Sequence, residues 1–374
     1  MQIAIISVTT GNGHNSTADA IAEEFHRQGI KAVKEDLFEY CSSFLFSALD
    51  RGYQFSTRYM PRQFGSTYNG LESHGALRKL LSPMSGNGYV VRKFSEYFRG
   101  NTPDAIIATH VFAAQVLNEL KSRGVLDMPL IGIITDYCIH PFWEECTGLD
   151  YIVTASGHLR LSAKKKGMDI SRILPFGIPI KPGFLSQVPK ETARQMLGLN
   201  PGQRTILMMG GSMGYGKLFS HVQELLEMEE NQQIVCICGN NQKLYQNLKE
   251  FANPNLHVRG FVDNVETYMD AADCIVTKPG GLTLAELMAK KLPAILINPI
   301  PGPEERNLDF MLNCGGAVKA SDYFPVSDAV YFLFSNPGRL RLMRETLGQI
   351  AHPDAARRIC DFTIKTVKDA VEAG

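Results

Sequence analysis

A glycine-rich turn that carries a histidine lies close to the start of the chain. Residues 10–16 read TGNGHNS and join an apolar run to a helical pattern over residues 17–28. Gly11 and Gly13 let the backbone approach a ligand closely, and the free amides at the start of a helix attract anions. A neutral imidazole at His14 could remove a proton from a hydroxyl group, or it could simply cap the loop. The turn therefore predicts contact with a ligand, with His14 as a candidate general base.

The same turn nearly matches a dinucleotide-binding pattern. Residues 11–16 read G-x-G-x-x-S, and Asp36 follows about 20 residues later, as the G-x-G-x-x-G fingerprint requires. A Rossmann loop needs only close approach of the backbone, so this alternative leaves His14 unexplained. An NAD-dependent enzyme stays a competing hypothesis.

A second glycine-rich segment, residues 209–218, reads MGGSMGYGKL. Its spacing from Gly211 to Lys217 imitates a P-loop, but Leu218 stands where a P-loop needs a serine or threonine hydroxyl for magnesium. We therefore reject an ATPase. Gly211 and Ser212 still suit contact with a phosphate without a metal, through backbone amides and one hydroxyl donor.

The strongest chemical pattern is residues 277–286, TKPGGLTLAE. A predicted strand ends here, Gly280 and Gly281 turn the chain, and a helix begins with Thr283 near its N-terminus. Free amides and the positive end of the helix dipole suit a diphosphate. Glu286 follows about one turn into the helix and could accept hydrogen bonds from both hydroxyls of a ribose. The alternative is a glycine-rich turn with a solvated glutamate.

The elements that must position these turns alternate regularly. Short β-branched runs and helical patterns follow one another along most of the chain, which is typical of parallel sheets covered on both faces. The predicted strands of the first half are 3–8, 32–37, 105–109, 130–135 and 151–154. Those of the second half are 205–209, 233–238, 256–259, 274–277, 293–297 and 317–319. We therefore expect an α/β protein with two doubly wound units.

The length of 374 residues also favours two domains, because single cores usually stop growing near roughly 250 to 300 residues. Prolines between residues 175 and 201 break any regular pattern, so we predict a first domain over 1–180 and a second over 181–352. A last helical pattern, 353–374, needs something to pack on, and we expect it to cross back onto the first domain. The residues near its packing face are Ala356, Ile359, Thr363, Val367 and Ala370.

Charge and cysteine usage exclude several classes of protein. The 38 basic and 38 acidic residues balance, so we expect no nucleic-acid partner. The chain starts without a basic n-region and has no stretch near the roughly 18 apolar residues of a membrane span, which predicts a cytoplasmic protein. The eight cysteines read as reduced core thiols. Cys138, His140 and Cys146 lack a paired C-x-x-C or H-x3-H unit, so we expect no zinc.

One stretch, residues 41–100, interrupts the alternation. It carries eight basic residues against three acidic ones, with aromatic and aliphatic residues between the arginines. Such a surface could lie on an anionic membrane, where each basic residue near the headgroups contributes about 1 kcal/mol. Its arginines include Arg58, Arg62 and Arg78. The alternative is a set of amphipathic helices that pack on their own domain.

Three segments together resemble a known enzyme family. They are residues 10–21 (TGNGHNSTADAI), 135–143 (TDYCIHPFW) and 277–307 (TKPGGLTLAELMAKKLPAILINPIPGPEERN). In this order they resemble the monogalactosyldiacylglycerol synthase and processive diacylglycerol glucosyltransferase group of glycosyltransferase family 28. The resemblance implies a GT-B fold, in which two Rossmann-like domains face a central cleft. The first domain would bind the acceptor and face the membrane, and the second would bind a UDP-sugar.

The resemblance also implies roles for residues of the second domain. Uracil would lie between Phe261 and Val262, and Glu286 would hold the ribose. Gly280, Gly281 and Thr283 would hold the diphosphate, with Gly211 and Ser212 stabilising the charge of the departing UDP.

The sugar hydroxyls would be reached by Glu304 and Asn307. The family usually reads Gly-Gln-Glu where this chain reads Gly302-Pro303-Glu304. A glutamine side chain that could distinguish sugar epimers is therefore missing. The donor sugar stays open between glucose, galactose and an N-acetylated sugar.

The resemblance places catalysis in the first domain. His14 matches the histidine of the family's glycine loop and is the first candidate for the catalytic base or for orienting the acceptor. Asp136 and His140 are the next candidates, because the carboxyl ends of strands face the ligand in open α/β sheets. The implied reaction is a single displacement with inversion, without a cofactor or an obligatory metal. Lys181 could add a cation for the departing UDP.

The implied partners are UDP-glucose or UDP-galactose and a diacylglycerol-type lipid. The family also contacts lipid through the segment after its second strand, which favours the membrane interpretation of residues 41–100. We therefore expect a cytoplasmic protein that is peripheral on the inner face of the cell membrane and binds its anionic surface.

Four other functions stay open. A UDP-sugar 2-epimerase or a transferase that uses UDP-N-acetylglucosamine would share the fold, and fold alone does not separate them. The NAD-dependent enzyme predicts affinity for NAD at residues 11–16. A UDP-sugar sensor without catalysis would bind UDP but form no product.

Overall fold

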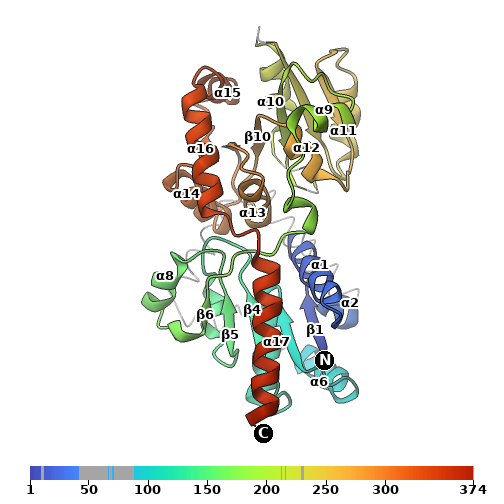
Figure 1. The fold of residues 1–374 in the computed structure, drawn as a ribbon, viewed down its shortest axis with the longest axis vertical. Coiled ribbons are helices and arrows are strands. Elements are labelled where there is room, and N and C mark those ends of the chain that lie inside the picture. Colours follow the sequence, from blue (N-terminus) through green and yellow to red (C-terminus); the bar gives the residue numbers. More distant parts are fainter. Residues whose placement is uncertain are drawn as a thin grey trace. The chain divides into compact units, whose positions relative to one another are not determined.

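The computed structural model describes residues 1–9, 12–41, 66, 70, 88–211, 213–214, 216–228 and 231–373. The chain divides into two compact units, and each contains one six-stranded sheet (Figure 1). The first unit holds Met1–Lys181, Ile300–Pro303 and His352–Gly374. The second unit holds Pro182–Pro299 and Glu304–Ala351.

The sheet of the first unit has the order β2-β1-β3-β4-β5-β6, and every pair in it is parallel. Its strands are β1 (Gln2–Ser7), β2 (Lys31–Asp36), β3 (Ala105–Ala108), β4 (Leu130–Ile133), β5 (Tyr151–Val153) and β6 (Ile173–Leu174). Ile3, Ile5 and Ile107 are fully buried, as strands covered on both faces require. The strands predicted for this half are confirmed. The sequence did not predict β6, because two residues are too few to form a pattern.

Helices α1 and α17 pack against each other and share one core with the sheet. In that core Ile21 and Phe25 of α1 lie with Ile359 of α17 and with the isoleucines of β1 and β3. The helices of this unit are α1 (Asn12–Arg27), α2 (Leu37–Cys41), α6 (Gly88–Gly100), α7 (Val111–Ser122), α8 (Leu159–Lys165) and α17 (Ala355–Ala373). Short 3-10 turns are η1 (Pro141–Glu145) and η2 (Ile170–Arg172). The last helix of the chain thus completes the core of the first unit.

Helix α1 begins earlier than the sequence predicted. We expected a helix over 17–28, but it begins at Asn12 and ends at Arg27. The first amides of a helix need no intrahelical partner, so residues 12–16 fit its first turn although they lack an apolar pattern. Gly13 and His14 therefore lie at the start of a helix, where backbone amides point outward. Gly11 lies outside the described residues.

Of the basic stretch 41–100, the structure describes mainly helix α6. Its buried side chains are Val90, Val91, Phe94 and Phe98. The apolar face of α6 contacts its own unit through α7, which contradicts a lipid-facing interpretation of this helix. The arginines of the predicted membrane patch, Arg58, Arg62 and Arg78, lie outside the described residues.

The sheet of the second unit has the order β12-β11-β10-β7-β8-β9, again with only parallel pairs. Its strands are β7 (Arg204–Met209), β8 (Gln232–Ile237), β9 (Leu256–Arg259), β10 (Cys274–Thr277), β11 (Ala294–Leu296) and β12 (Ala317–Lys319). Each of them was predicted. The helices are α9 (Lys190–Met196), α10 (Leu218–Leu226), α11 (Gln242–Lys249), α12 (Val265–Ala271), α13 (Gly281–Ala289), α14 (Pro303–Asn313), α15 (Val326–Phe334) and α16 (Pro337–Ile350), with the 3-10 turn η3 (Pro182–Phe184).

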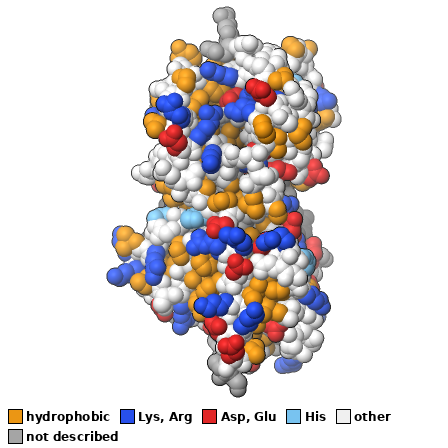
Figure 2. All heavy atoms as spheres, viewed as in Figure 1, with side chains coloured by type: hydrophobic (Ala, Val, Ile, Leu, Met, Phe, Trp, Pro, Cys, Tyr) orange, Lys and Arg blue, Asp and Glu red, His pale blue; other side chains and the backbone are white. Residues whose placement is uncertain are grey.

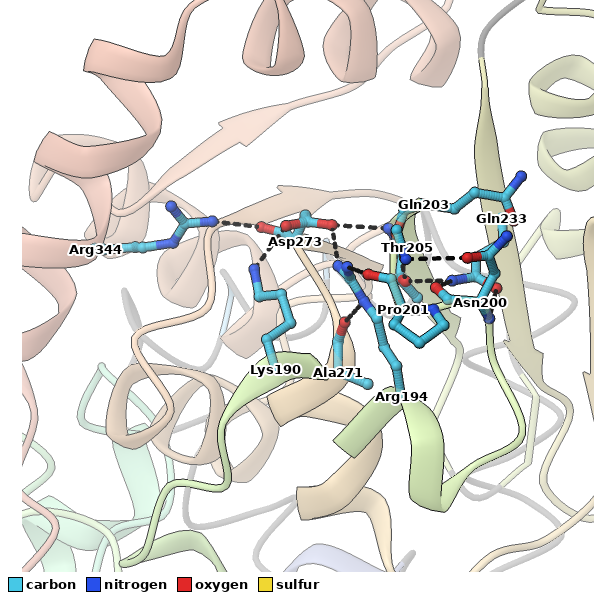
Figure 3. A network of polar contacts seen from close by, with 11 residues as sticks. Lys190, Arg194, Asn200, Pro201, Gln203, Thr205, Gln233, Ala271, Asp273 and Arg344 are labelled. Atoms are coloured by element: carbon cyan, nitrogen blue, oxygen red, sulfur yellow. Dashed lines mark hydrogen bonds and ion pairs between the residues drawn. The ribbon is translucent and has the colours of Figure 1, made fainter. Parts of the chain in front are cut away.

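A network of polar contacts ties the amino ends of β7 and β10 together (Figure 3). Asp273, directly before β10, accepts hydrogen bonds from Lys190 Nζ at 2.6 Å, from Arg194 Nη2 at 2.6 Å and from the Thr205 amide at 2.8 Å. Arg194 is 6% exposed, so its buried guanidinium needs hydrogen-bond acceptors such as the Asp273 carboxylate. The network lies at the sheet edge opposite the predicted ligand turns.

No described helix combines the length and the apolar character that crossing a bilayer takes. On the face drawn in Figure 2, both units carry basic as well as acidic side chains.

Candidate functional site

The sheet of the first unit changes its winding direction between β1 and β3, which are neighbours although β2 lies between them in the chain. Open α/β sheets bind ligands at the carboxyl ends of their strands at such a point. His14 follows β1, and Thr109 follows β3. The structure joins the two, because His14 Nδ1 lies 2.8 Å from the carbonyl oxygen of Thr109.

This contact determines which ring nitrogen of His14 carries the proton. A carbonyl oxygen can only accept, so His14 Nδ1 must donate its hydrogen to Thr109. The Thr135 hydroxyl oxygen, 3.2 Å from the same nitrogen, follows β4 and lies beside this bond. In the neutral ring Nε2 then keeps its lone pair. His14 is thereby oriented to accept a proton at Nε2.

Burial lowers the pKa of His14 below its usual value of 6.5, although the hydrogen bond to Thr109 and the charge of Asp136 both act to raise it. The imidazole is therefore neutral near pH 7, the state that a general base needs. Asp136 follows β4, as predicted, and its carboxylate acts on His14 through its charge. The structure thus brings two of the three predicted catalytic residues into electrostatic contact.

A pH profile tests this coupling. If His14 is the base, kcat/KM should hold through pH 6.5 and fall only at lower pH, where the lowered pKa of His14 lies. Asp136→Asn removes a charge that raises this pKa, so the acid limb should move to still lower pH. The exposed Asp127, changed to Asn, is the control and should leave the limb in place. A limb that moves upward in Asp136→Asn would contradict the assignment.

His110 belongs to the site, and sequence reasoning missed it. Its ring meets that of His14 edge to face, with 4.4 Å between the centroids and an angle of 81°. Its Nδ1 accepts a hydrogen bond from the Phe112 amide at 3.1 Å and caps α7. Burial, with His14 and His140 as further causes, holds the pKa of His110 well below its usual range. The sequence feature that could have identified His110 is its position directly after the predicted strand 105–109.

His140 has a structural task in addition to any catalytic one. Its Nδ1 accepts from the Phe142 amide at 3.2 Å and caps the turn η1. Because Nδ1 is an acceptor, Nε2 carries the proton of the neutral ring. His140 can thus donate a hydrogen bond but cannot take a proton while it caps η1. A positive charge on His140 would lower the pKa of His110, so the two rings lie at the same end of the sheet.

A relay of polar side chains holds the start of α1 on the strand ends. Ser7 Oγ donates to Asn15 Oδ1 at 2.8 Å, and Asn15 Nδ2 donates to Thr9 Oγ1 at 2.7 Å. Thr9 Oγ1 in turn donates to Asp36 Oδ2 at 2.6 Å. Asp36, the acidic residue of the dinucleotide-binding pattern, therefore accepts a hydrogen bond inside this relay. The relay fixes the helix turn on which His14 lies.

The second unit has its own switch point, between β7 and β10. Counted from β9, its strands follow the order 3-2-1-4-5-6, which binds nucleotides in many α/β proteins. Gly211, after β7, has φ +71°, a conformation that glycine adopts without strain. A Cβ at this position would lie 3.4 Å from Lys278 Cε, so the turns after β7 and β10 are in contact. Ser212 lies outside the described residues.

The turn after β10 has features that suit an anion. Gly280 is the N-cap of α13 and has no side chain that could accept from the first helix amides. A Cβ on Gly280 would lie 3.8 Å from Lys278 Nζ and 3.7 Å from Glu304 Oε1. The ammonium group of Lys278 thus lies at the positive end of the α13 dipole, and both favour negative charge there.

Lys278 is a second residue that sequence reasoning missed. It forms an ion pair with Glu304, and the two side chains are 23% and 11% exposed. The cation that we predicted, Lys181, is exposed in the first unit. Lys278 could have been found from its place between the end of a predicted strand and Gly280.

The other predicted donor residues lie on or beside α13 and α14. Asn307 is fully buried, and its Nδ2 donates to the Pro279 carbonyl at 3.0 Å, which holds the turn after β10. Glu286 is buried within α13, and Thr283 is half-buried in its first turn. Their contacts with a nucleotide sugar stay predictions.

Phe261 follows β9 and is 60% exposed, which is unusual for a phenylalanine. An exposed aromatic ring beside the half-buried Val262 suits stacking on a nucleobase. Across the described ranges, no three His, Cys, Asp or Glu side chains form a group that could hold a metal ion. At the second switch point, the described positive groups include the ammonium of Lys278 and the first amides of α13.

Comparisons with known protein families match both halves of the chain. Residues 14–180 match the model of monogalactosyldiacylglycerol (MGDG) synthase, and residues 205–313 match the glycosyltransferase family 28 C-terminal domain. A processive diacylglycerol beta-glucosyltransferase of Bacillus pumilus is 27% identical and covers 97% of this chain and 94% of that protein. The enzyme of the same name from Bacillus subtilis is 26% identical, covering 97% and 95%.

Solved structures share the fold at low sequence identity. MurG from Acinetobacter baumannii has a TM-score of 0.62 at 16% identity and covers 97% of this chain and 99% of its own. A UDP-GlcNAc 2-epimerase from Neisseria meningitidis, bound to UDP-GlcNAc, has a TM-score of 0.62 at 12% identity and covers 98% and 100%. At these identities the likeness concerns the fold alone.

Proposed function

Because this chain belongs to the monogalactosyldiacylglycerol synthase and processive diacylglycerol glucosyltransferase group of glycosyltransferase family 28, we propose that it transfers a hexose from a UDP-sugar to a diacylglycerol-type lipid. The chain is a glycosyltransferase, and the predicted fold class, α/β with two doubly wound GT-B units, is confirmed. An epimerase has the same fold, so the substrates must be argued from the site.

The hydrogen bond from His14 Nδ1 to the Thr109 carbonyl carries the proposal. It leaves Nε2 as the basic nitrogen of a neutral imidazole, at the strand ends of the domain that matches the MGDG synthase model. The acceptor hydroxyl attacks the anomeric carbon while its proton passes to His14 Nε2. The bond from that carbon to the diphosphate oxygen breaks, and UDP departs. A single displacement of this kind inverts the anomeric configuration.

Negative charge grows on the departing diphosphate, and the second unit has positive groups in position to stabilise it. These are the amides that begin α13 and the ammonium group of Lys278. They could supply the positive charge that a metal supplies in other transferases. We accordingly propose that transfer continues in the presence of a chelator.

The donor sugar follows from the relatives and from helix α14. The relatives are named glucosyltransferases, so UDP-glucose is the first candidate, with UDP-galactose second. Pro303 is the first residue of α14, a position that tolerates proline because its amide needs no partner. The glutamine of the family is therefore replaced without cost to the helix. Selection between sugars then depends on the remaining polar side chains, Glu304 and Asn307.

A membrane-bound acceptor requires contact with a bilayer surface. We propose that the protein is peripheral on the cytoplasmic face of the cell membrane, with Arg58, Arg62 and Arg78 toward anionic lipid. The basic and aromatic composition of residues 42–87 supports this, whereas helix α6 does not contribute its apolar face.

A transfer assay tests the proposed function. Radiolabelled UDP-glucose, UDP-galactose and UDP-N-acetylglucosamine are each incubated with the protein and diacylglycerol in mixed vesicles, with and without EDTA. We expect label in the organic phase from UDP-glucose, at equal rates under both conditions. Absence of label from every donor would contradict the lipid acceptor.

Two controls separate the alternatives. Incubation with UDP-N-acetylglucosamine alone should leave it unchanged, whereas an epimerase would convert it without an acceptor. Calorimetry should detect binding of UDP and no binding of NAD. Binding of UDP without any product would favour a sensor.

A further inference from the structure

Lys278 and Glu304 form an ion pair, although the proposed function assigns them different ligands: the diphosphate to Lys278 and the sugar to Glu304. Lys278 lies beside the N-cap of α13, where the diphosphate would bind. Glu304 lies in the first turn of α14, where the sugar would bind. Both side chains are mostly buried, so each charge needs a partner at all times. In the structure each is a charged partner of the other.

We propose that this ion pair is a partner-exchange latch, in which the donor diphosphate replaces Glu304 on Lys278 and so releases the Glu304 carboxylate for the sugar hydroxyls. The inference rests on the proposed function, since it assigns the roles of the diphosphate and the sugar at the same site. It adds that a bound diphosphate is what makes the sugar-binding group available. A nucleotide without diphosphate would leave the latch closed.

The geometry around Gly211 and Gly280 supports the exchange. Lys278 Cε lies 3.4 Å from the place of a Cβ on Gly211, and Nζ lies 3.8 Å from that of a Cβ on Gly280. The absence of side chains at both positions leaves the ammonium group facing two backbone turns that suit phosphate oxygens. Glu304 Oε1 lies 3.7 Å from the same Gly280 position. The carboxylate and an incoming phosphate therefore compete for one cation.

Calorimetric titration with UDP tests the latch, because the two partners should respond with opposite sign. Lys278→Met should weaken UDP binding by roughly 10- to 100-fold, since a charge-assisted contact is lost. Glu304→Gln removes the competitor and should strengthen UDP binding by about fivefold. The same variant should lose affinity for UDP-glucose relative to UDP, because its amide replaces the carboxylate that would accept from the sugar hydroxyls. Lys278→Arg keeps the cation and should retain most of the affinity.

The controls separate the latch from a structural role and from failure of the proposed function. Glu144→Gln interrupts a Lys–Glu pair of similar exposure, 26% and 13%, in the first unit, and should leave UDP affinity unchanged. The double variant Lys278→Met with Glu304→Gln should bind UDP as weakly as Lys278→Met alone, because without Lys278 there is no cation for which Glu304 competes. This comparison remains usable if the single variant Glu304→Gln proves unstable. No UDP binding by the unaltered protein would refute the proposed function. Unaltered or weaker UDP binding by folded Glu304→Gln would refute the latch alone.

Discussion

Replacing His14 by alanine should reduce the rate of sugar transfer by about 10²- to 10⁴-fold, the usual contribution of a general base. The hydrogen bond to Thr109 at 2.8 Å fixes Nδ1 as donor and Nε2 as acceptor, and alanine removes both. Affinity for UDP should stay nearly unchanged, because the groups assigned to the nucleotide belong to the second unit. The measurement is kcat for lipid transfer beside a UDP titration of the same preparation.

Two further variants make the His14 result specific. His14→Gln can still donate to the Thr109 carbonyl but cannot take a proton, so its kcat should fall nearly as far as that of the alanine variant. His26 is an exposed histidine on the same helix, and His26→Ala should transfer sugar at the normal rate. If His14→Gln kept normal turnover, His14 would orient the acceptor and another group would take the proton.

The neighbourhood of His14 holds three imidazoles whose ring nitrogens have different partners. His110 and His140 both use Nδ1 to cap a turn or helix, so their rings carry the proton on Nε2. Burial keeps the pKa of His110 well below its usual range, which prevents a second positive charge beside His14. Of these three imidazoles, only His14 has its Nδ1 committed as a donor.

The sequence predicted the sheets well because their signal is local. Strands buried on both faces need continuous apolar runs, and such runs mark β1, β3, β7 and β10 without reference to the rest of the chain. The turns after β1, β7 and β10 were predicted as ligand sites for the same reason, since glycine before a helix has a local physical meaning.

The parts that the sequence did not predict depend on distant partners. The hydrogen bond between His14 and Thr109 joins residues 95 positions apart in the chain. No local spacing pattern predicts such a contact. The pairing of Lys278 with Glu304 likewise depends on how α14 returns to the turn after β10. The early start of α1 was missed because polar residues 12–16 carry no apolar period. In each case tertiary contact supplies information that a local pattern lacks.

Replacing Asp273 by alanine should destabilise the second unit by about 3 to 5 kcal/mol, because it leaves the buried Arg194 guanidinium without its carboxylate partner. Asp273 accepts from both Lys190 and Arg194 at 2.6 Å, and the Arg194 side chain is 7% exposed. It also accepts from the Thr205 amide at 2.8 Å, which ties β10 to β7 (Figure 3). Urea titration followed by circular dichroism measures the loss.

UDP affinity of the folded Asp273 variant should nevertheless stay normal. Asp273 precedes β10, whereas the turn with Lys278 follows it, so the strand of Cys274–Thr277 separates them by about 3.3 Å per residue. Asp322→Ala, at an exposed position of the same unit, should change stability by no more than about 0.5 kcal/mol. A loss below about 1 kcal/mol in Asp273→Ala would mean that Lys190 and Arg194 reach water instead. A loss of stability with unchanged UDP affinity would support the separation of the two groups of residues. The network around Asp273 would then act at one end of these strands, and the nucleotide turns would lie at the other.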